Sequence, residues 1–192
     1  MKNWFVSDLI FNSLYPKPIQ EVAEKHWTPI NVAKKAAAFL ATSENVKVLD
    51  IGSGSGKFCL IAAHEHPLTN FYGVEQRQNL VDLSTELAKE LQLENIFFIC
   101  ENICNIDFEM YDHFYFYNSF YENVPGTQKI DSTIKYSEDL YNYYNRYLYR
   151  QLKKKPSGTR LVTYHSFGRE IPAGYEVVNT DYNEFLKFWV KI

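Results

Sequence analysis

The sequence predicts an α/β fold built on a single doubly wound, mostly parallel β-sheet that closes with a C-terminal β-hairpin. Three observations support this fold class. Short apolar runs without polar alternation recur along the chain, as expected for strands that are buried on both faces. Segments with apolar residues at helical spacing separate these runs, which is typical of a parallel sheet covered by helices on both faces. The last two apolar runs follow the strand before them without room for a full helix, and this spacing indicates a hairpin.

The N-terminal part of the chain predicts two helices before the first strand. Ser7 is suited to cap a short helix over residues 6–14. Thr28 followed by Pro29 is a capping residue followed by proline at the first helical position, so it predicts a helix through the run VAKKAAAFL. We expect residues 1–25 to form either a helix packed on the surface or a lid over the site.

Strands and helices then alternate to the C-terminus. The predicted strands span residues 46–51, 70–75, 95–100, 113–118 and 159–165. The predicted helices span residues 57–66, 77–92 and 131–154. The second of these helices carries leucines at helical spacing, and the third carries a stripe of tyrosines and leucines that we interpret as facing the core. Residues 175–179 and 185–192 predict the closing hairpin.

Composition limits the class of protein. The chain has 192 residues, of which 46% are hydrophobic and 22% charged, so we expect a single domain over residues 1–192. The net charge of −3 gives no overall field that attracts nucleic acid, and this argues against a nucleic-acid partner. No apolar run has the length of a membrane span. Three cysteines without a CxxC pair indicate buried thiols and a cytoplasmic location, and nothing indicates the oligomeric state.

Polar residues follow four of the predicted strands at their carboxyl ends. They are the segments 50–56, 101–102 and 118–121 and the single residue Glu75. Because ligands of such sheets bind outside the carboxyl ends of the strands, at the switch point, we expect these residues to share one rim. The sequence therefore predicts one ligand site at this edge of the sheet.

The glycine-rich turn after the first strand, DIGSGSG, narrows the choice of ligand. A phosphate-binding loop needs G-x-x-x-x-G-K followed by Ser or Thr, whereas Ile51 stands at the first glycine position and Phe58 replaces the hydroxyl. The dinucleotide pattern G-x-G-x-x-G is one residue longer than the spacing of Gly52, Gly54 and Gly56. An acidic residue beside the loop would repel a pyrophosphate and suits a cationic ligand.

With Asp50 two residues before the first glycine, the turn resembles the first motif of the class I S-adenosylmethionine (SAM)-dependent methyltransferases. The resemblance covers about residues 26–192, in element order as well as in motif. It implies a Rossmann-like methyltransferase fold and SAM as cofactor. It further implies that Glu75 accepts from the ribose hydroxyls, that Gln76 lies near the adenine, and that Asn102 holds the adenine amino group. The full set of implied cofactor residues is Asp50, Gly52, Ser53, Gly54, Gly56, Glu75, Gln76 and Asn102.

The segment after the fourth strand, NSFY, resembles the Asn/Asp-Pro-Pro-aromatic motif of methyltransferases that act on amino nitrogens. Asn118 and Tyr121 are kept, but both prolines are missing. The resemblance implies that the acceptor is an amino nitrogen of a protein side chain or a small molecule. His165 ends the fifth strand, and its side chain could act as a base near neutral pH. The candidate catalytic residues are thus Asn118, Tyr121 and His165. Asn118 could instead only cap a turn.

Other interpretations stay open at this point. An NAD-dependent oxidoreductase would use a similar turn, and a catalytically inactive module that binds SAM or a partner would keep the fold without the transfer. No cluster of His, Cys and acidic residues has metal-ligand spacing, so no metal is predicted. The basic residues between 146 and 160 are interpreted as cations that favour a helix C-terminus, rather than as a nucleic-acid patch.

Overall fold

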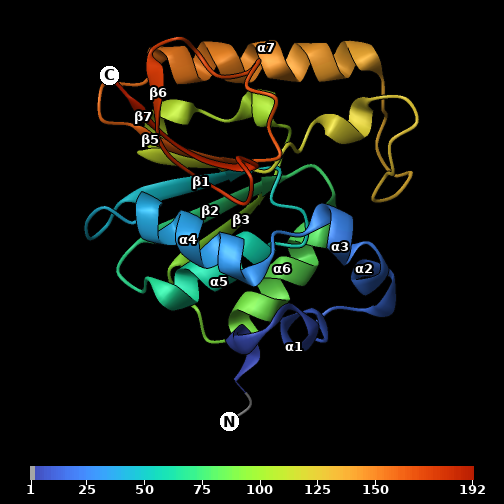
Figure 1. The fold of residues 1–192 in the computed structure, drawn as a ribbon. Coiled ribbons are helices and arrows are strands. Elements are labelled where there is room, and N and C mark those ends of the chain that lie inside the picture. Colours follow the sequence, from blue (N-terminus) through green and yellow to red (C-terminus); the bar gives the residue numbers. More distant parts are fainter. Residues whose placement is uncertain (1–2) are drawn as a thin grey trace.

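The computed structural model describes residues 3–192 and contains one seven-stranded sheet (Figure 1). The strands run in the order β3-β2-β1-β4-β5-β7-β6. The first five in this order pair in parallel, and β7 and β6 pair antiparallel to their neighbours. The strand bounds are β1 Lys47–Ile51, β2 Asn70–Glu75, β3 Ile96–Cys100, β4 His113–Phe116, β5 Arg160–Tyr164, β6 Tyr175–Asp181 and β7 Leu186–Lys191. The predicted doubly wound sheet with its C-terminal hairpin is confirmed.

Helices cover both faces of this sheet (Figure 1). On one face lie α4 Ile30–Leu40, α5 Lys57–Glu65 and α6 Gln78–Glu90; on the other lies α7 Glu138–Lys154. The first face buries a core that includes Val48, Phe71 and Val162, and the second a core that includes Leu49, Phe114 and Leu161. Alternate residues of β1 thus enter opposite cores, because successive side chains of a strand point to opposite faces. The switch point, where β2 and β4 leave β1 on opposite sides, lies at the carboxyl end of β1.

The N-terminal segment packs against the first core. It contains the turn η1 Trp4–Val6 and three short helices, α1 Asp8–Asn12, α2 Lys17–Glu21 and α3 Ala23–His26. Ser7 caps α1 by accepting from the Ile10 amide, as predicted. The Asp8 carboxylate accepts from the Ile30 amide and pairs with the buried Lys57 ammonium. These contacts bind the segment to the helices that flank the site.

Two helix starts differ from the prediction. Helix α4 begins at Ile30 with Pro29 as its N-cap, and the Thr28 hydroxyl does not cap it but is hydrogen-bonded to the Tyr115 hydroxyl at 3.0 Å. Helix α7 begins at Glu138 rather than at residue 131, with Ser137 as its cap. The prediction that Thr28 caps this helix was wrong. The buried Tyr115 hydroxyl on β4 needs a hydrogen-bond partner, and the Thr28 hydroxyl supplies it.

The connection between β5 and β6 holds no helix, as the short spacing predicted. Single-turn 3₁₀ helices occur elsewhere, at η2 Ile103–Asn105, η3 Phe108–Met110 and η4 Tyr121–Asn123. Of the three thiols predicted to be buried, Cys59 is buried, Cys104 is half-buried and Cys100 is exposed, so the prediction was wrong for Cys100 and only partly right for Cys104. Within residues 3–192, no helix has the length and apolar character needed to cross a membrane.

Candidate active site

A cavity of about 570 Å³ opens at the carboxyl edge of the sheet, beside the switch point. Its volume lies in the range of small-molecule sites. It brings together nine of the predicted site residues: Asp50, Gly52, Ser53, Gly54, Glu75, Gln76, Asn118, Tyr121 and His165. Two predicted residues, Gly56 and Asn102, are not among those that line it. The rim inferred from strand ends therefore exists, with these two exceptions.

The glycine-rich turn between β1 and α5 needs its glycines for the packing of the protein itself. Gly52, Gly54 and Gly56 all have left-handed φ angles, at +75°, +53° and +75°. A Cβ at Gly54 would overlap the Trp27 ring, and a Cβ at Gly56 would lie 2.7 Å from the Phe98 ring. Glycine is the only residue that tolerates both the backbone conformation and the close approach.

Asp50 places a carboxyl group at the bottom of the cavity, 3% exposed. Among the described residues, its one side-chain hydrogen-bond partner is the Cys59 thiol, which donates to Oδ2 at 3.5 Å. Burial, together with a smaller contribution from the nearby Glu75 carboxylate, raises the pKa of Asp50 to about 8. A cationic ligand beside Asp50 would relieve this penalty, because an opposite charge favours the ionised carboxylate.

The two carboxylate oxygens of Glu75 differ in how they are used. Oε1 accepts from the backbone amides of Gln76 at 2.9 Å and Arg77 at 3.1 Å, and from Nη1 of Arg77 at 2.9 Å. Within residues 3–192, Oε2 accepts only from the Gly54 amide, at 3.2 Å. Because a carboxylate oxygen can accept two hydrogen bonds, Oε2 retains capacity for a ligand hydroxyl.

Arg77 connects Glu75, the carboxylate predicted to bind the ribose, to the segment that follows β4. The sequence did not predict a role for Arg77. Its guanidinium, 2% exposed, pairs with Glu75 and through Nη2 with both Glu122 oxygens, at 2.8 and 2.7 Å. It also donates to Asp131 at 3.2 Å and to the Tyr136 hydroxyl at 2.8 Å. Burial opposes its charge, but the adjacent carboxylates hold the pKa of Arg77 above its ordinary value. The only signal in the sequence was that Arg77, a cation, directly follows Glu75 and Gln76 of the predicted rim.

The Asn102 side chain is hydrogen-bonded to other protein groups and is not among those that line the cavity. Its Nδ2 donates to Gln76 Oε1 at 3.0 Å and to the Tyr144 hydroxyl at 2.9 Å, and its Oδ1 accepts from the Cys104 amide. Its neighbours in the chain, Glu101 and Ile103, line the cavity instead. Asn102 therefore does not line the cavity itself, and its contact with the adenine stays a prediction.

The turn after β4 is held by hydrogen bonds where the resembling motif has prolines. Asn118 has a φ of +39°, and its carbonyl accepts from the Tyr121 amide at 2.9 Å. The Ser119 hydroxyl donates to the Ile51 carbonyl, which connects the carboxyl ends of β4 and β1. These contacts fix the backbone of the turn and leave Asn118 and Tyr121 on the lining of the cavity.

Aromatic side chains surround the mouth of the cavity. The rings of Tyr121 and Phe167, 41% and 63% exposed, lie 5.7 Å apart between centroids. Deeper in, burial raises the pKa of Tyr117 to about 12, so its hydroxyl stays protonated. His165, with a φ of +53°, packs against Phe185 at 4.5 Å, and burial lowers its pKa. Its imidazole is therefore neutral at pH 7.

Two residues before α4, His26 and Trp27, lie beside the glycine turn and line the cavity. Trp27 donates from Nε1 to the Ile19 carbonyl at 2.8 Å, and its ring lies over Gly54. His26 also lines the cavity, and its Nε2 is buried without a hydrogen-bond partner in the described part of the chain. Burial lowers the pKa of His26. The segment thus closes one side of the cavity.

Comparison with known proteins identifies the family to which this chain and its site belong. A model of the family described as "Methyltransferase domain" matches residues 42–185, which include the whole glycine turn, Glu75 and Asn118. The chain belongs to this methyltransferase family. The resemblance to the class I SAM-dependent methyltransferases is confirmed, SAM is the cofactor, and the alternative of an NAD-dependent oxidoreductase is not favoured.

Relatives and solved structures agree with this assignment. An RNA methyltransferase from Salinibacter ruber, solved with S-adenosyl-L-homocysteine, shares the fold of the methyltransferase domain: the TM-score is 0.60 with 18% identity, over 85% of this chain and 91% of that one. A tRNA (guanine-N(7)-)-methyltransferase of Synechocystis sp. is 32% identical over 68% of this chain and 53% of its own length. One from Synechococcus sp. is 53% identical over 29% of this chain and 23% of its own length. The chain thus spans about a quarter to a half of these curated relatives.

The names of these relatives correct one prediction. The net charge argued against a nucleic-acid partner, whereas both curated relatives are named for methylation of tRNA, one of them aligned over two thirds of this chain. The prediction was wrong because a net charge averages over the whole surface and does not describe how charges are distributed on it.

The residues of the cavity fit SAM. SAM is a cationic sulfonium with a ribose, and the cavity offers the buried Asp50 carboxyl without a cationic partner and a free acceptor position on Glu75. The buried Ser53 hydroxyl lines the same turn without a hydrogen-bond partner among the described residues. Orphaned polar groups of this kind are expected where a ligand supplies the missing partners. A polyanionic ligand would meet two carboxylates in the same place.

The buried Asp50 carboxyl predicts a specific pH dependence of stability. Between its ordinary value near 4 and its raised pKa of about 8, the folded protein binds a proton that the unfolded chain does not. The free energy of unfolding should therefore fall with rising pH, by up to about 1.4 kcal/mol per pH unit from this group. In Asp50→Asn this contribution disappears. Urea unfolding at pH 5, 6 and 7 would show wild type losing stability relative to the variant. The exposed Asp82→Asn serves as a control and should keep the wild-type profile; parallel profiles for wild type and Asp50→Asn would contradict the assignment.

Proposed function

We propose that this chain is a SAM-dependent RNA methyltransferase whose acceptor is the N7 atom of a guanine. The observation that carries the proposal is the pair of exposed aromatic rings, Tyr121 and Phe167, at the mouth of an acidic cavity. The curated relatives are named for methylation of guanine N7 in tRNA, and this supports the proposed acceptor. Because the chain spans only part of their length, the acceptor is argued from the site as well.

The cofactor side of the proposal uses the strand ends. We infer that Asp50 faces the cationic part of SAM and that Glu75 Oε2 accepts from a ribose hydroxyl, with Gln76 beside the adenine. When bound, SAM would supply a methyl carbon on a sulfonium, to which a nitrogen lone pair would bond as the C–S bond breaks and S-adenosylhomocysteine leaves. Such a transfer depends on alignment and proximity more than on a strong acid or base. The turn glycines let the backbone come close to this ligand.

The acceptor side uses the loops after β4 and β5. RNA bases that are recognised individually are unstacked and placed against aromatic side chains. The Tyr121 and Phe167 rings are exposed, adjacent and on the lining of the cavity, so a flipped base could stack there and reach inward. The Asn118 side chain, three residues before Tyr121, lines the same cavity.

Guanine N7 suits this site because it carries no proton. Its lone pair is free at neutral pH, so attack needs no general base, and the neutral His165 need not accept a proton. The O6 atom beside N7 is a hydrogen-bond acceptor. We infer that the Asn118 amide donates to O6 and thereby aims N7 at the methyl group. Glu122 also lines the cavity, with its charge balanced by the Arg77 guanidinium.

The test is methyl transfer from labelled SAM to RNA, followed by digestion to nucleosides. Purified chain is incubated with unmodified tRNA transcripts, with a protein extract and with free metabolites. Label in 7-methylguanosine supports the proposal. Label only in protein or in small amines would reject the RNA acceptor. Tight SAM binding without transfer to any of the three would favour the alternative of an inactive binding module.

A second candidate keeps the amino-nitrogen acceptor that the sequence predicted. The position of Asn118 favours it, at the carboxyl end of β4 and on the cavity, where its side-chain oxygen could accept from a target NH₂ group. Here the neutral His165 could also accept a proton. A guanine acceptor would use the NH₂ group of Asn118 as a hydrogen-bond donor, whereas an amino-nitrogen acceptor would use its oxygen as a hydrogen-bond acceptor. Substitutions of Asn118 can distinguish the two.

Substitution of Asn118 is expected to impair turnover and to spare cofactor affinity. Asn118→Ala removes both ends of the amide, so kcat should fall about 10- to 100-fold while the Kd for SAM stays within twofold. Asn118→Asp keeps an acceptor and loses the donor. If O6 of guanine is the partner, Asn118→Asp should be as impaired as Asn118→Ala. If an amino group is the partner, Asn118→Asp should retain most of the activity. Wild-type turnover in Asn118→Ala would exclude both roles.

A further inference from the structure

The basic residues of this acidic protein are concentrated in one stretch. Residues 140–169 contain seven Lys and Arg and no Asp or Glu, although the whole chain has a net charge of −3. Two of the seven serve the fold. The buried Lys155 ammonium donates to the carbonyls of Phe108 and Tyr111, and Arg160 donates to the Phe39 carbonyl. The remaining five are exposed and need another explanation.

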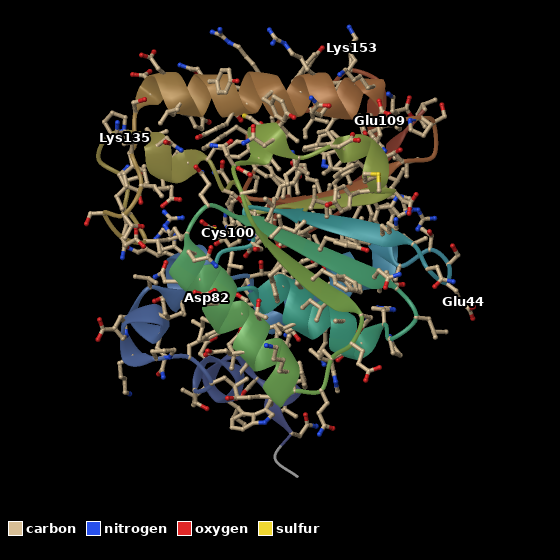
Figure 2. All side chains as sticks on the ribbon, turned by 180° about the vertical axis from the view of Figure 1, so that it is seen from behind. Glu44, Asp82, Cys100, Glu109, Lys135 and Lys153 are labelled. Carbon is tan, nitrogen blue, oxygen red and sulfur yellow. The ribbon has the colours of Figure 1, made fainter. Side chains whose placement is uncertain are left out.

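Four of the exposed cations lie on one face of α7, which we name the basic face: Arg146, Arg150, Lys153 and Lys154. Their spacing of three and four residues places them side by side on the helix. The opposite face, with Tyr144, Leu148 and Leu152, is buried against the sheet. Figure 2 shows nitrogen-tipped side chains, Lys153 among them, that project from α7 away from the sheet.

Stability does not account for the basic face. None of its four cations takes part in an ion pair within residues 3–192. Like charges four residues apart, such as Arg146 and Arg150, destabilise a helix by a few tenths of a kcal/mol. Attraction to the helix dipole acts only within the last turn, so it explains Lys153 and Lys154 and not Arg146 or Arg150, which lie further back.

The helix that carries the basic face also contacts the lining of the cavity, through its buried side. The Tyr144 ring packs on Phe120, a residue of the cavity lining, with centroids 5.4 Å apart. Arg169, the fifth exposed cation, follows Phe167 by two residues. From Tyr144 to Lys153 the helix rises by about 14 Å, at 1.5 Å per residue. At about 3.4 Å of rise per nucleotide of one strand, this distance corresponds to a few nucleotides.

We propose that the basic face of α7 binds the phosphate backbone of the RNA whose target base enters the cavity. The inference rests on the proposed function. Unpaired cations on an exposed helix face are complementary to phosphates, and their contacts position the nucleic acid without reading its sequence. Each contact releases counterions, so binding through this face weakens with salt. The α7 helix thus places the RNA, and the aromatic rim receives the base.

The test compares two double variants with the same change of net charge. R150E/K153E reverses two cations of the basic face. K17E/K89E reverses two exposed lysines on α2 and α6, across the sheet from α7. Lys154 is left unchanged because it shares a small hollow with Glu109 and Asp112. Binding of a tRNA transcript is measured with saturating S-adenosylhomocysteine at several KCl concentrations between 50 and 200 mM, alongside the Kd for SAM and the Tm.

We expect R150E/K153E to bind the transcript at least about tenfold more weakly than wild type, with a shallower dependence of log K on log salt. Each lost phosphate contact should reduce that slope by about 0.7–0.9. The Kd for SAM and the Tm should not change, and K17E/K89E should stay within about twofold to threefold of wild type. Equal weakening in both double variants would show a general charge effect and overturn the assignment of the face.

Failure of this inference can be told apart from failure of the proposed function. If wild type forms 7-methylguanosine in RNA and R150E/K153E binds and methylates the transcript as wild type does, only the basic face is wrong. If wild type neither binds nor methylates RNA, the proposed function fails and the inference fails with it. Loss of binding to vesicles rich in phosphatidylserine, with RNA binding unchanged, would assign the face to a membrane surface and overturn the proposal.

Discussion

Replacement of Arg77 by methionine is expected to lower the free energy of unfolding by about 3–5 kcal/mol. The side chain is 2% exposed and its guanidinium neutralises Glu75 and Glu122, which are 6% and 10% exposed. Methionine fills similar space but leaves both carboxylates buried without their cation, and removal of one partner from a buried ion pair costs this much. Urea unfolding followed by circular dichroism would measure the loss.

Two further variants calibrate this result. Arg77→Lys keeps the charge but cannot make the forked contacts to Glu75, Glu122 and Asp131 at once, so an intermediate loss is expected. Arg146→Met removes an exposed arginine without an ion pair and should change stability by less than about 0.5 kcal/mol. If Arg77→Met unfolded with the same free energy as Arg146→Met, the buried network would not stabilise the site.

Gly54→Val is expected to damage SAM binding and stability together. The residue has a φ of +53°, which a β-branched side chain adopts at a cost of about 1–2 kcal/mol. A Cβ there would also overlap the ring of Trp27, which lines the cavity. Trp27 must therefore move, and overpacking adds about 1–3 kcal/mol. We expect the affinity for SAM to fall at least about tenfold, measured by calorimetric titration, and the Tm to fall with it.

Gly158→Val provides the matched control for this variant. Gly158 has a φ of +87°, and a Cβ there would meet no atom within 4 Å. The substitution carries the same kind of backbone strain far from the cavity, so stability should fall modestly and the Kd for SAM should stay at the wild-type value. Wild-type affinity in folded Gly54→Val would separate the glycine turn from cofactor binding.

The parts of the site that the sequence predicted are those that depend on local order along the chain. Asp50 and Glu75 end neighbouring strands, and β1 pairs with β2 in register from Lys47 with Asn70 onward. Once the apolar runs are assigned as parallel strands, their ends must meet at one edge. The left-handed glycines follow from the same local logic, because a tight turn from strand to helix needs positive φ angles.

The parts that were missed depend on contacts between distant segments. Arg77 meets Glu122, Asp131 and Tyr136 across 45 to 59 positions of sequence. These contacts also explain why α7 begins late: residues 131–136 are held against Arg77 instead of continuing the helix. Periodicity alone could not reveal this, because the tyrosine spacing before Glu138 is compatible with a helix. The hydrogen bonds from the Asn102 amide to Tyr144 and Gln76 also join distant segments, so they too could not be read from local order.

The connections after β4 and β5 carry a consequence for how such proteins diverge. The proposed donor site rests on strand ends and on the glycine turn, where a change of one side chain disturbs the core. The proposed acceptor rim rests on Tyr121 and on Phe167, the latter in a helix-free connection held by a few local bonds such as that from the Gly168 amide to the Ser166 hydroxyl. Mutation can rebuild that connection without moving a strand. Proteins descended from one ancestral gene can therefore change the methyl acceptor while they keep the binding site for the methyl donor. Selection for a new methyl acceptor then has few residues to alter.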